Sequence, residues 1–308
     1  MAMTVENVFT KGKSEWHAID ENKVEYKGDT YYRNTAVKAI LCMGVDRKDD
    51  MTETIASDGY IGSADGLILV VQDTARNKVK LLMIPRDSIV EMEILDEMDN
   101  SLGYQYEHLC RAFVYGDGNT GSCERVVQST SDLLCGLDIS YYFATDIASL
   151  SILNDAVGGV EVIVPNDDLI KANPKWEKGK KVVLHGDEAE HFIRYRDSNI
   201  DKTSITRMTQ HEAYIQGFYN AVLSNKKTNF DIVEELVAMI EDYMISNMHK
   251  DSYMKLALDV LQNGVFEEKD IQTLPGTAYA YGIDTEVAVD YDKAIPMLLE
   301  LFYLKESE

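Results

Sequence analysis

Two aspartates stand at the ends of apolar segments, where they could bind a metal ion. Asp46 follows the apolar run 37–45, which reads as a buried strand, and Asp65 precedes a second run that begins at Gly66. If these strands are antiparallel neighbours, both carboxylates approach one end of the sheet, where α/β folds bind ligands. Two carboxylates with phosphate oxygens and water suit Mg²⁺. On spacing alone, the alternative is that both are ordinary loop aspartates.

An arginine directly follows a third apolar run. Pro85 ends this run, and Arg86 and Asp87 come next. An arginine in this position lies at the sheet edge, where its planar fork can bind a phosphate. The alternative is an ion pair between Arg86 and Asp87, or one at the surface.

The densest basic cluster occupies 194–211. Arg194 and Arg196 share one face of an extended segment, since side chains alternate there. Arg207, Gln210 and His211 share a helix face through their three- and four-residue spacing. Charge-assisted forked bonds of this kind hold a pyrophosphate and stabilise charge that develops on it in a transition state. The alternative is that the cluster pairs with the surplus carboxylates.

Composition restricts the partners of such a site. The 308 residues include 53 acidic and 30 basic side chains, a net charge of −23, which argues against a general nucleic-acid binder. The apolar fraction of 45% and only five prolines exclude intrinsic disorder. No run approaches the roughly 20 apolar residues of a membrane span, so the chain as written is expected to be soluble. Its polar start after Met1-Ala2-Met3 is compatible with a membrane anchor having been trimmed.

The cysteines do not form a disulfide scaffold or a zinc motif. Cys42 lies in an apolar run and reads as a buried thiol. Cys110 and Cys123 flank the turn-rich segment 115–122, and a bridge closing such a loop could stabilise the fold by about 3 kcal/mol. The alternative is two reduced core cysteines.

Apolar patterning predicts interleaved strands and helices. Residues 1–35 read as a loosely packed N-terminal segment, and 46–64 and 91–103 as acidic loops. Residues 36–308 read as one α/β sandwich domain, with a mixed central sheet and helices on both faces. The expected strands are 37–45, 66–71, 79–84, 139–145, 160–165, 271–274 and 286–289, and the expected helices are 105–114, 122–135, 146–157, 186–194, 204–224, 229–244, 249–263 and 292–303.

In this order and spacing, the segments resemble the LytR-CpsA-Psr (LCP) family of cell-wall glycopolymer ligases, from about Val37 to Tyr303. The pair Cys110 and Cys123 resembles a clostridial branch of that family. The resemblance rests on Gly44-x-Asp46, on Asp65, on Ile-Pro-Arg-Asp at 84–87, on Tyr115-Gly116, on Asn-Asp-Ala-Val-Gly-Gly-Val at 154–160, on Leu184-x-Gly186-x-x-Ala189, on Arg194-x-Arg196 and on Arg207.

The resemblance implies a Mg²⁺-dependent phosphotransferase on the extracellular face of the bacterial cytoplasmic membrane, usually anchored by one N-terminal helix. Such enzymes move a teichoic acid, capsular polysaccharide or similar polymer from undecaprenyl-pyrophosphate to a peptidoglycan hydroxyl. An apolar tunnel takes the prenyl chain, and we expect it to be lined by strands 37–45, 66–71 and 79–84 with helices 122–135 and 204–224. By position, Asp46 and Asp65 would bind Mg²⁺, Arg86, Arg194, Arg196 and Arg207 the pyrophosphate, and Arg47, Gln210 and His211 the substrate, while Asp87 would orient Arg86 or act as base.

Two departures from the family pattern favour a second hypothesis. Ser63-Ala64-Asp65-Gly66 stands where the family frequently has Arg-Ser-Asp-Thr, and Gln210-His211 replaces an Arg-Gln pair. The second hypothesis is a prenyl-pyrophosphate-binding envelope protein with weak or no transferase activity. A third, an interaction or regulatory protein of the envelope, would need only the acidic surface.

Overall fold

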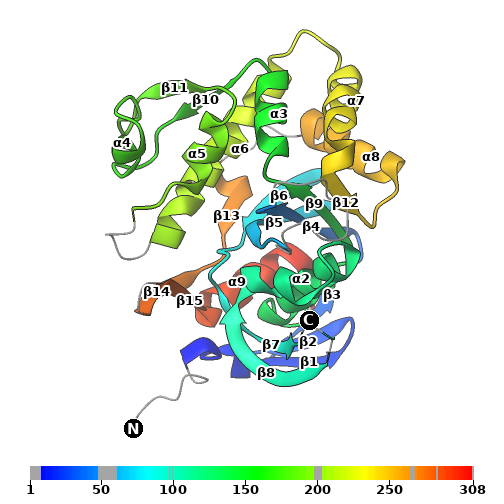
Figure 1. The fold of residues 1–308 in the computed structure, drawn as a ribbon. Coiled ribbons are helices and arrows are strands. Elements are labelled where there is room, and N and C mark those ends of the chain that lie inside the picture. Colours follow the sequence, from blue (N-terminus) through cyan, green and yellow to red (C-terminus); the bar gives the residue numbers. More distant parts are fainter. Residues whose placement is uncertain are drawn as a thin grey trace.

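A six-stranded mixed sheet runs through the middle of the molecule, in the order β12-β9-β4-β5-β6-β13 (Figure 1). This computed structural model describes residues 8–47, 61–96, 98, 100–197, 203–263, 268–281 and 284–306. Strand β4 pairs antiparallel with β5 and parallel with β9, which confirms the predicted mixed sheet. The strands of this sheet are β4 (Val37–Val45), β5 (Ala64–Asp73), β6 (Lys78–Met83), β9 (Tyr141–Asp146), β12 (Met244–Ser246) and β13 (Ile271–Thr273).

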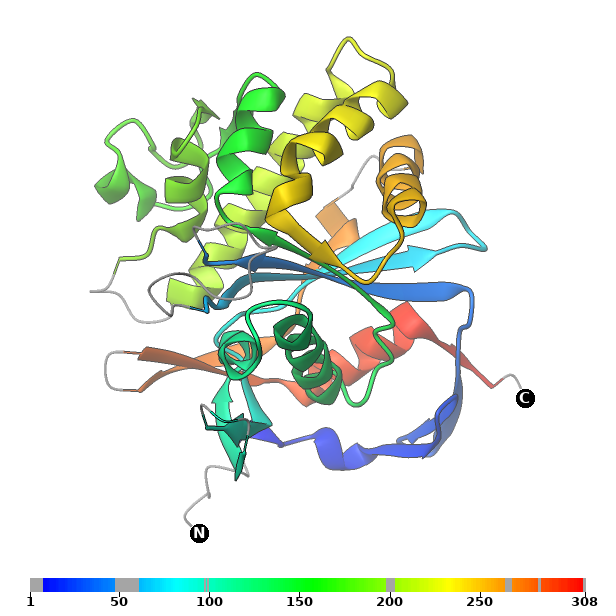
Figure 2. The same ribbon diagram turned by 45° about the vertical axis from the view of Figure 1, so that its right-hand side comes forward.

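Helices cover both faces of this sheet (Figure 2). Leu41 and Leu69 face one layer, which contains α2 (Thr120–Leu133) and α9 (Tyr291–Phe302). Ile40 and Val70, their neighbours along the strands, face the opposite layer. Both faces are buried, which explains why these strands read as continuous apolar runs. The opposite layer contains α6 (Thr203–Leu223), α7 (Asn229–Ile240) and α8 (Lys250–Asn263), and α3 (Ser149–Ala156) packs against α7.

A small lobe packs on α6 and leads the chain into the arginine cluster (Figure 1). Trp176 and Phe192 lie in its separate apolar core. Gly217 of α6 permits the close approach of strand β10, because a Cβ there would lie 2.4 Å from the carbonyl oxygen of Glu161. The lobe consists of β10 (Val160–Ile163), α4 (Leu169–Ala172), β11 (Lys181–Leu184) and α5 (Glu188–Arg194).

The N-terminal segment forms a four-stranded sheet with the last strand of the chain. Trp16 packs edge-on against Tyr303 with 5.5 Å between ring centroids, and Val24 belongs to the main core. The expectation of a loosely packed segment at 1–35 is therefore wrong for its described part, since the completing strand comes from the distant C-terminus. The strands are β1 (Trp16–Asp20), β2 (Lys23–Tyr26), β3 (Asp29–Arg33) and β16 (Tyr303–Lys305), and a short helical turn, η1 (Lys13–Glu15), precedes them.

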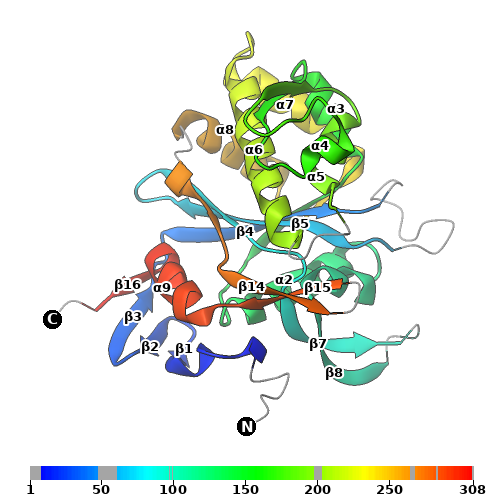
Figure 3. The ribbon, with the colours of Figure 1, turned by 90° about the vertical axis from the view of Figure 1, so that its left-hand side faces the viewer.

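Two hairpins extend on the α2 and α9 side of the sheet (Figure 3). Hairpin β7 (Ile89–Leu95) and β8 (Ser101–His108) replaces the predicted loop at 91–103 and the first half of the predicted helix at 105–114. The second half of that predicted helix is the 3-10 helix η2 (Leu109–Tyr115). Hairpin β14 (Gly276–Tyr281) and β15 (Asp284–Val289) has a first strand that the sequence did not indicate. Short 3-10 turns η3 (Glu241–Tyr243) and η4 (Glu268–Asp270) complete the elements.

Two expectations remain, one about the loop after β4 and one about membrane-spanning helices. Most of the predicted acidic loop after β4, residues 48–60, lies outside the described residues. Among the described helices, none is both long enough and apolar enough to cross a bilayer.

Candidate functional site

The antiparallel pair β4–β5 brings the two predicted metal ligands together. Gly44 lies opposite Gly66 in the register, and the backbone N–H of Asp46 donates to the carbonyl of Ser63 over 2.8 Å. The Ser63 hydroxyl donates to Asp65 Oδ1 over 2.6 Å. Asp46 and Asp65 therefore project from the same end of the sheet, as their positions on adjacent strands predicted.

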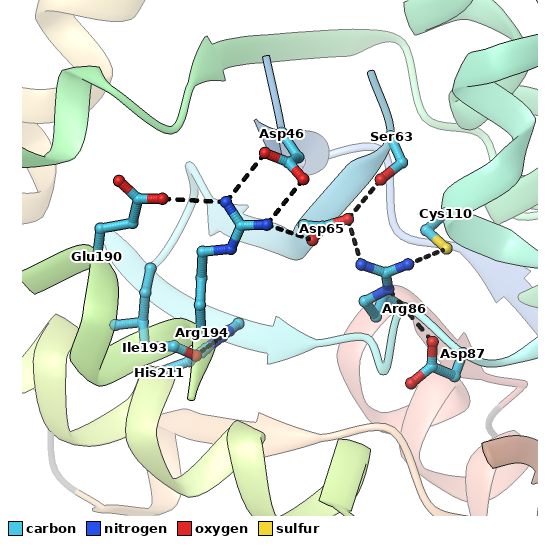
Figure 4. Close-up of polar contacts among 10 residues, drawn as sticks. All are labelled: Asp46, Ser63, Asp65, Arg86, Asp87, Cys110, Glu190, Ile193, Arg194 and His211. Atoms are coloured by element: carbon cyan, nitrogen blue, oxygen red, sulfur yellow. Dashed lines mark hydrogen bonds and ion pairs between the residues drawn. The ribbon is translucent and has the colours of Figure 1, made fainter. Parts of the chain in front are cut away.

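Arg194 lies between these carboxylates (Figure 4). Its two terminal nitrogens donate to Asp46 Oδ1 over 2.9 Å and to Asp46 Oδ2 over 2.7 Å. Nη2 is 4.0 Å from Asp65 Oδ2, and Nη1 also donates to Glu190 Oε1 over 3.0 Å. The last residue of α5 thus reaches both aspartates across 148 positions of sequence from Asp46.

Arg86 enters the site from beyond β6. It forms an ion pair with Asp65 and a second with Asp87, 3.2 Å from Nε to Oδ1. Its Nη2 donates to Cys110 Sγ over 3.0 Å. Cys110 and Cys123 are both free thiols, so the structure has the reduced alternative and not the disulfide. Burial raises the pKa of the Cys110 thiol to about 11, despite the nearby guanidinium.

Four guanidinium groups surround one polar cavity of about 350 Å³. Arg207 is only 7% exposed, and burial together with the positive charge of Arg86 lowers the pKa of its guanidinium. Within the described ranges, no carboxylate lies within 4.0 Å of the guanidinium nitrogens of Arg196 or Arg207. These two groups are thus available to an anion. The cavity is lined by Asp46, Ser63, Asp65, Arg86, Asp87, His108, Arg194, Arg196, Arg207 and Thr285.

The three predicted substrate contacts lie outside this cavity. Arg47 is 1% exposed, and its Nη1 donates to the carbonyl of Gly118 over 2.8 Å. Gln210 donates to the carbonyls of Phe192, over 2.8 Å, and Tyr195, over 3.2 Å. Sequence spacing placed Arg47 and Gln210 near the site but could not show that they point into the protein. Gln210 instead fixes the end of α5, from which Arg194 and Arg196 project.

His211 also supports the end of α5. Its Nε2 lies 3.2 Å from the carbonyl of Ile193, which can only accept, so Nε2 carries the hydrogen. Burial lowers the pKa of His211 to about 4, with a further contribution from Arg207. The imidazole is consequently neutral near pH 7, and its Nε2–H is already bonded to the backbone. Both features disfavour the predicted contact to phosphate.

An apolar cavity of about 380 Å³ lies between the sheet and the helices α6, α7 and α8. Phe218, Leu236 and Val260 are among its lining side chains. A smaller cavity of about 120 Å³ lies along the same strands and helix, and Asp65, Arg194 and Arg207 line both it and the polar cavity. Helix 122–135, expected to line a tunnel, corresponds to α2 and covers the opposite sheet face. That part of the prediction is wrong.

Sequence reasoning missed four residues around the site. Glu190 precedes Arg194 by one helical turn, a spacing that could have indicated it. Asp146 ends β9, and its carboxyl is buried, which raises its pKa to about 6. His108 and Thr285 line the polar cavity from β8 and β15. No local sequence signal marks them, because hairpin packing alone brings them there.

The two aspartates lie close enough together for one positive centre to face both carboxylates. A single cationic nitrogen of Arg194 already lies 2.7 Å from Asp46 and 4.0 Å from Asp65. Among the described residues, no group of three or more histidine, cysteine and carboxylate side chains could hold a metal. Mg²⁺ held here would therefore complete its ligand set with water, and with phosphate oxygens once a pyrophosphate is bound.

Known proteins share this chain's sequence pattern and fold. The LytR_cpsA_psr family model matches residues 2–293. The polyisoprenyl-teichoic acid–peptidoglycan teichoic acid transferase TagU of Enterococcus faecalis is 24% identical over 82% of this chain and 75% of its own length. The crystal structure of Bacillus subtilis TagV has a TM-score of 0.61 at 21% identity, covering 87% of this chain and 97% of that one. TagT bound to LIIa-WTA has the same TM-score at 17% identity, with 87% and 90% covered. The match of the family model over nearly the whole length shows that this chain belongs to the LytR-CpsA-Psr family.

Proposed function

We propose that the protein transfers a glycopolymer from a polyprenyl-pyrophosphate carrier to peptidoglycan, at the extracellular face of the bacterial cytoplasmic membrane. The observation that carries this proposal is the convergence of four arginines and two aspartates on one polar cavity, with an apolar cavity farther along the same strands and helix. The teichoic acid transferase name of the E. faecalis relative supports the same reaction class. Teichoic acids, capsular polysaccharides and other secondary wall polymers are the candidate cargoes.

The polar cavity would hold the pyrophosphate. Arg196 and Arg207 have guanidiniums without carboxylate partners in the described part of the chain, so they are ready to bind its oxygens. Arg86, oriented by Asp87, would add a third group. Fixed guanidiniums stabilise the charge that develops on a phosphoryl group during transfer.

Mg²⁺ would be held by Asp46 and Asp65 together with pyrophosphate oxygens, and when bound it would neutralise charge on the phosphates. The acceptor hydroxyl would attack the phosphorus that carries the polymer. The bond from this phosphorus to the bridging oxygen would break, and the prenyl monophosphate would leave. Asp87, which lines the cavity at 7% exposure, would receive the hydroxyl proton once Arg86 turns toward the phosphate.

The apolar cavity would take the prenyl chain. Its lining is almost entirely apolar, and burying methylene groups there contributes about 0.8 kcal/mol for each. Gly44 and Gly66 line the small cavity nearest the polar site, so a larger side chain at either position would narrow it. This arrangement suits a ligand with a charged head and an aliphatic tail.

The test is a transfer assay with purified protein, Mg²⁺, a prenyl-pyrophosphate-linked saccharide and peptidoglycan. We expect release of prenyl monophosphate and labelled peptidoglycan, both lost in Arg194→Ala and Arg196→Ala. The matched control is Arg76→Ala, since Arg76 is exposed, pairs with Asp73 at the far end of β5 and should leave transfer unchanged. Lipid binding without turnover in the unmodified protein would reject the transferase and favour the prenyl-pyrophosphate-binding hypothesis.

A further inference from the structure

Arg194 occupies the position between Asp46 and Asp65 that a divalent cation would need. Its paired nitrogens use both oxygens of Asp46, at 2.9 and 2.7 Å, and Nη2 faces Asp65 at 4.0 Å. This forked ion pair takes one lone pair on each Asp46 oxygen, and its positive charge repels a second cation at the same carboxylate. A metal ion that binds Asp46 would therefore favour movement of the guanidinium.

Glu190 is a second carboxylate partner of the guanidinium, and it lies in the same helix as Arg194. It lies one turn before Arg194 in α5, and its Oε1 accepts from Nη1 over 3.0 Å. This spacing keeps the two side chains adjacent on the helix surface whether or not Asp46 is paired with Arg194. Both side chains are about one-third exposed, so neither is locked by packing.

We propose that Glu190 is a positioning residue that retains Arg194 when a divalent cation takes Asp46 and Asp65, so that the metal and the guanidinium exchange places. This inference rests on the proposed function. Nη1 would remain on Glu190 while Nη2, released from Asp46, would turn toward the pyrophosphate. The cation would thereby complete two parts of the site in one step, its own ligand set and the donor set of Arg194.

The local charges support the exchange. Arg86 pairs with Asp65 and Asp87, and Arg194 pairs with Asp46 and Glu190, so four carboxylates share two guanidiniums. This half of the site has a formal charge of −2, which one divalent cation would neutralise. Without Glu190, a guanidinium displaced from Asp46 would lose its second carboxylate partner. It would then compete more strongly with the cation for Asp46.

The test measures Mg²⁺ binding by calorimetry in the absence of any lipid, on the unmodified protein, Glu190→Gln, Arg194→Met and the double variant. We expect Arg194→Met to tighten Mg²⁺ binding by about tenfold, because it removes the competitor. We expect Glu190→Gln to weaken binding by about fivefold, and by less than about twofold when Arg194 is already Met. Such non-additivity is typical of residues that contact each other.

Loss of charge alone would weaken Mg²⁺ binding equally in both backgrounds, and that result would overturn the proposal. Failure of the unmodified protein to bind Mg²⁺ at millimolar concentration would also overturn it. Circular dichroism checks that each variant is folded, and Arg194→Gln replaces Arg194→Met if the latter unfolds. The transfer assay is separate: non-additive Mg²⁺ binding without transfer refutes only the proposed function, and transfer with additive binding refutes only this exchange.

Discussion

Arg207 offers a substitution whose effects on stability and on binding should have opposite signs. Its guanidinium is 7% exposed, and within the described residues no carboxylate lies close enough to form an ion pair with it. Burial and the charge of Arg86 lower the pKa of this guanidinium, which means that the ligand-free fold holds the charge at a cost. Methionine has a similar length and no charge. Arg207→Met should thus stabilise the ligand-free protein by about 1–3 kcal/mol, as replacement of buried ions by apolar side chains often does.

The same substitution should damage function. A hydrogen bond from a charged donor contributes about 1.5–3 kcal/mol to binding, so affinity for pyrophosphate should fall by at least about tenfold. Loss of one donor to a developing oxyanion should reduce the transfer rate by about 10²–10³-fold.

Urea unfolding and thermal melting, each with and without pyrophosphate and Mg²⁺, measure both effects. The unmodified protein should gain stability from the ligand and Arg207→Met should gain little, while Arg76→Met should behave as the unmodified protein does. A less stable ligand-free Arg207→Met that still responds to pyrophosphate like the unmodified protein would refute the reasoning. It would show that Arg207 serves the fold and not the anion.

Three further predictions follow from the packing around the site. His211→Gln should remove a loss of about 2 kcal/mol in stability between pH 7 and pH 5, because a buried histidine of pKa about 4 lets the unfolded chain take up the proton first; urea titrations at both pH values check this. Ala257→Trp should fill part of the apolar cavity and weaken a long-chain prenyl-pyrophosphate more than inorganic pyrophosphate, measured by calorimetry; equal weakening would contradict the tail assignment. Gly217→Ala should destabilise the fold by about 1–3 kcal/mol by pushing β10 from α6, and an unchanged urea midpoint would contradict that close approach.

Five of the six strands of the central sheet could be predicted from the sequence because their signals are local, whereas β12 (Met244–Ser246) was not predicted. The run Val37 to Val45 is apolar on both faces and forms β4 with the predicted boundaries. The positions of Asp46 and Asp65 at neighbouring strand ends were then sufficient to bring them together. Arg86 follows the end of β6 as predicted, but Arg194 is the last residue of α5 and not part of the predicted extended segment.

The remaining errors come from contacts between distant segments. The N-terminal strands were not predicted because their own residues are mostly polar. Their packing partners, β16 and the main core, are distant in sequence. Arg47 follows Asp46 directly, yet its side chain turns inward to the carbonyl of Gly118, which spacing cannot reveal. Gln210 and His211 were placed on the correct helix, but their partners are backbone carbonyls whose positions depend on how α5 ends.

The charges around the polar cavity explain how so acidic a protein could accept a pyrophosphate. Asp46, Asp65, Asp87 and Glu190 formally balance the four arginines, so the site is close to neutral within a chain of net charge −23. A divalent cation would give the site a formal charge of +2, equal and opposite to that of a pyrophosphate diester. The bound cation and the bound pyrophosphate would then neutralise each other's charge, so their affinities would be coupled. By thermodynamic linkage, this coupling would act equally in both directions. If the proposed function holds, the acidic residues beside the arginines would make anion binding depend on the cation.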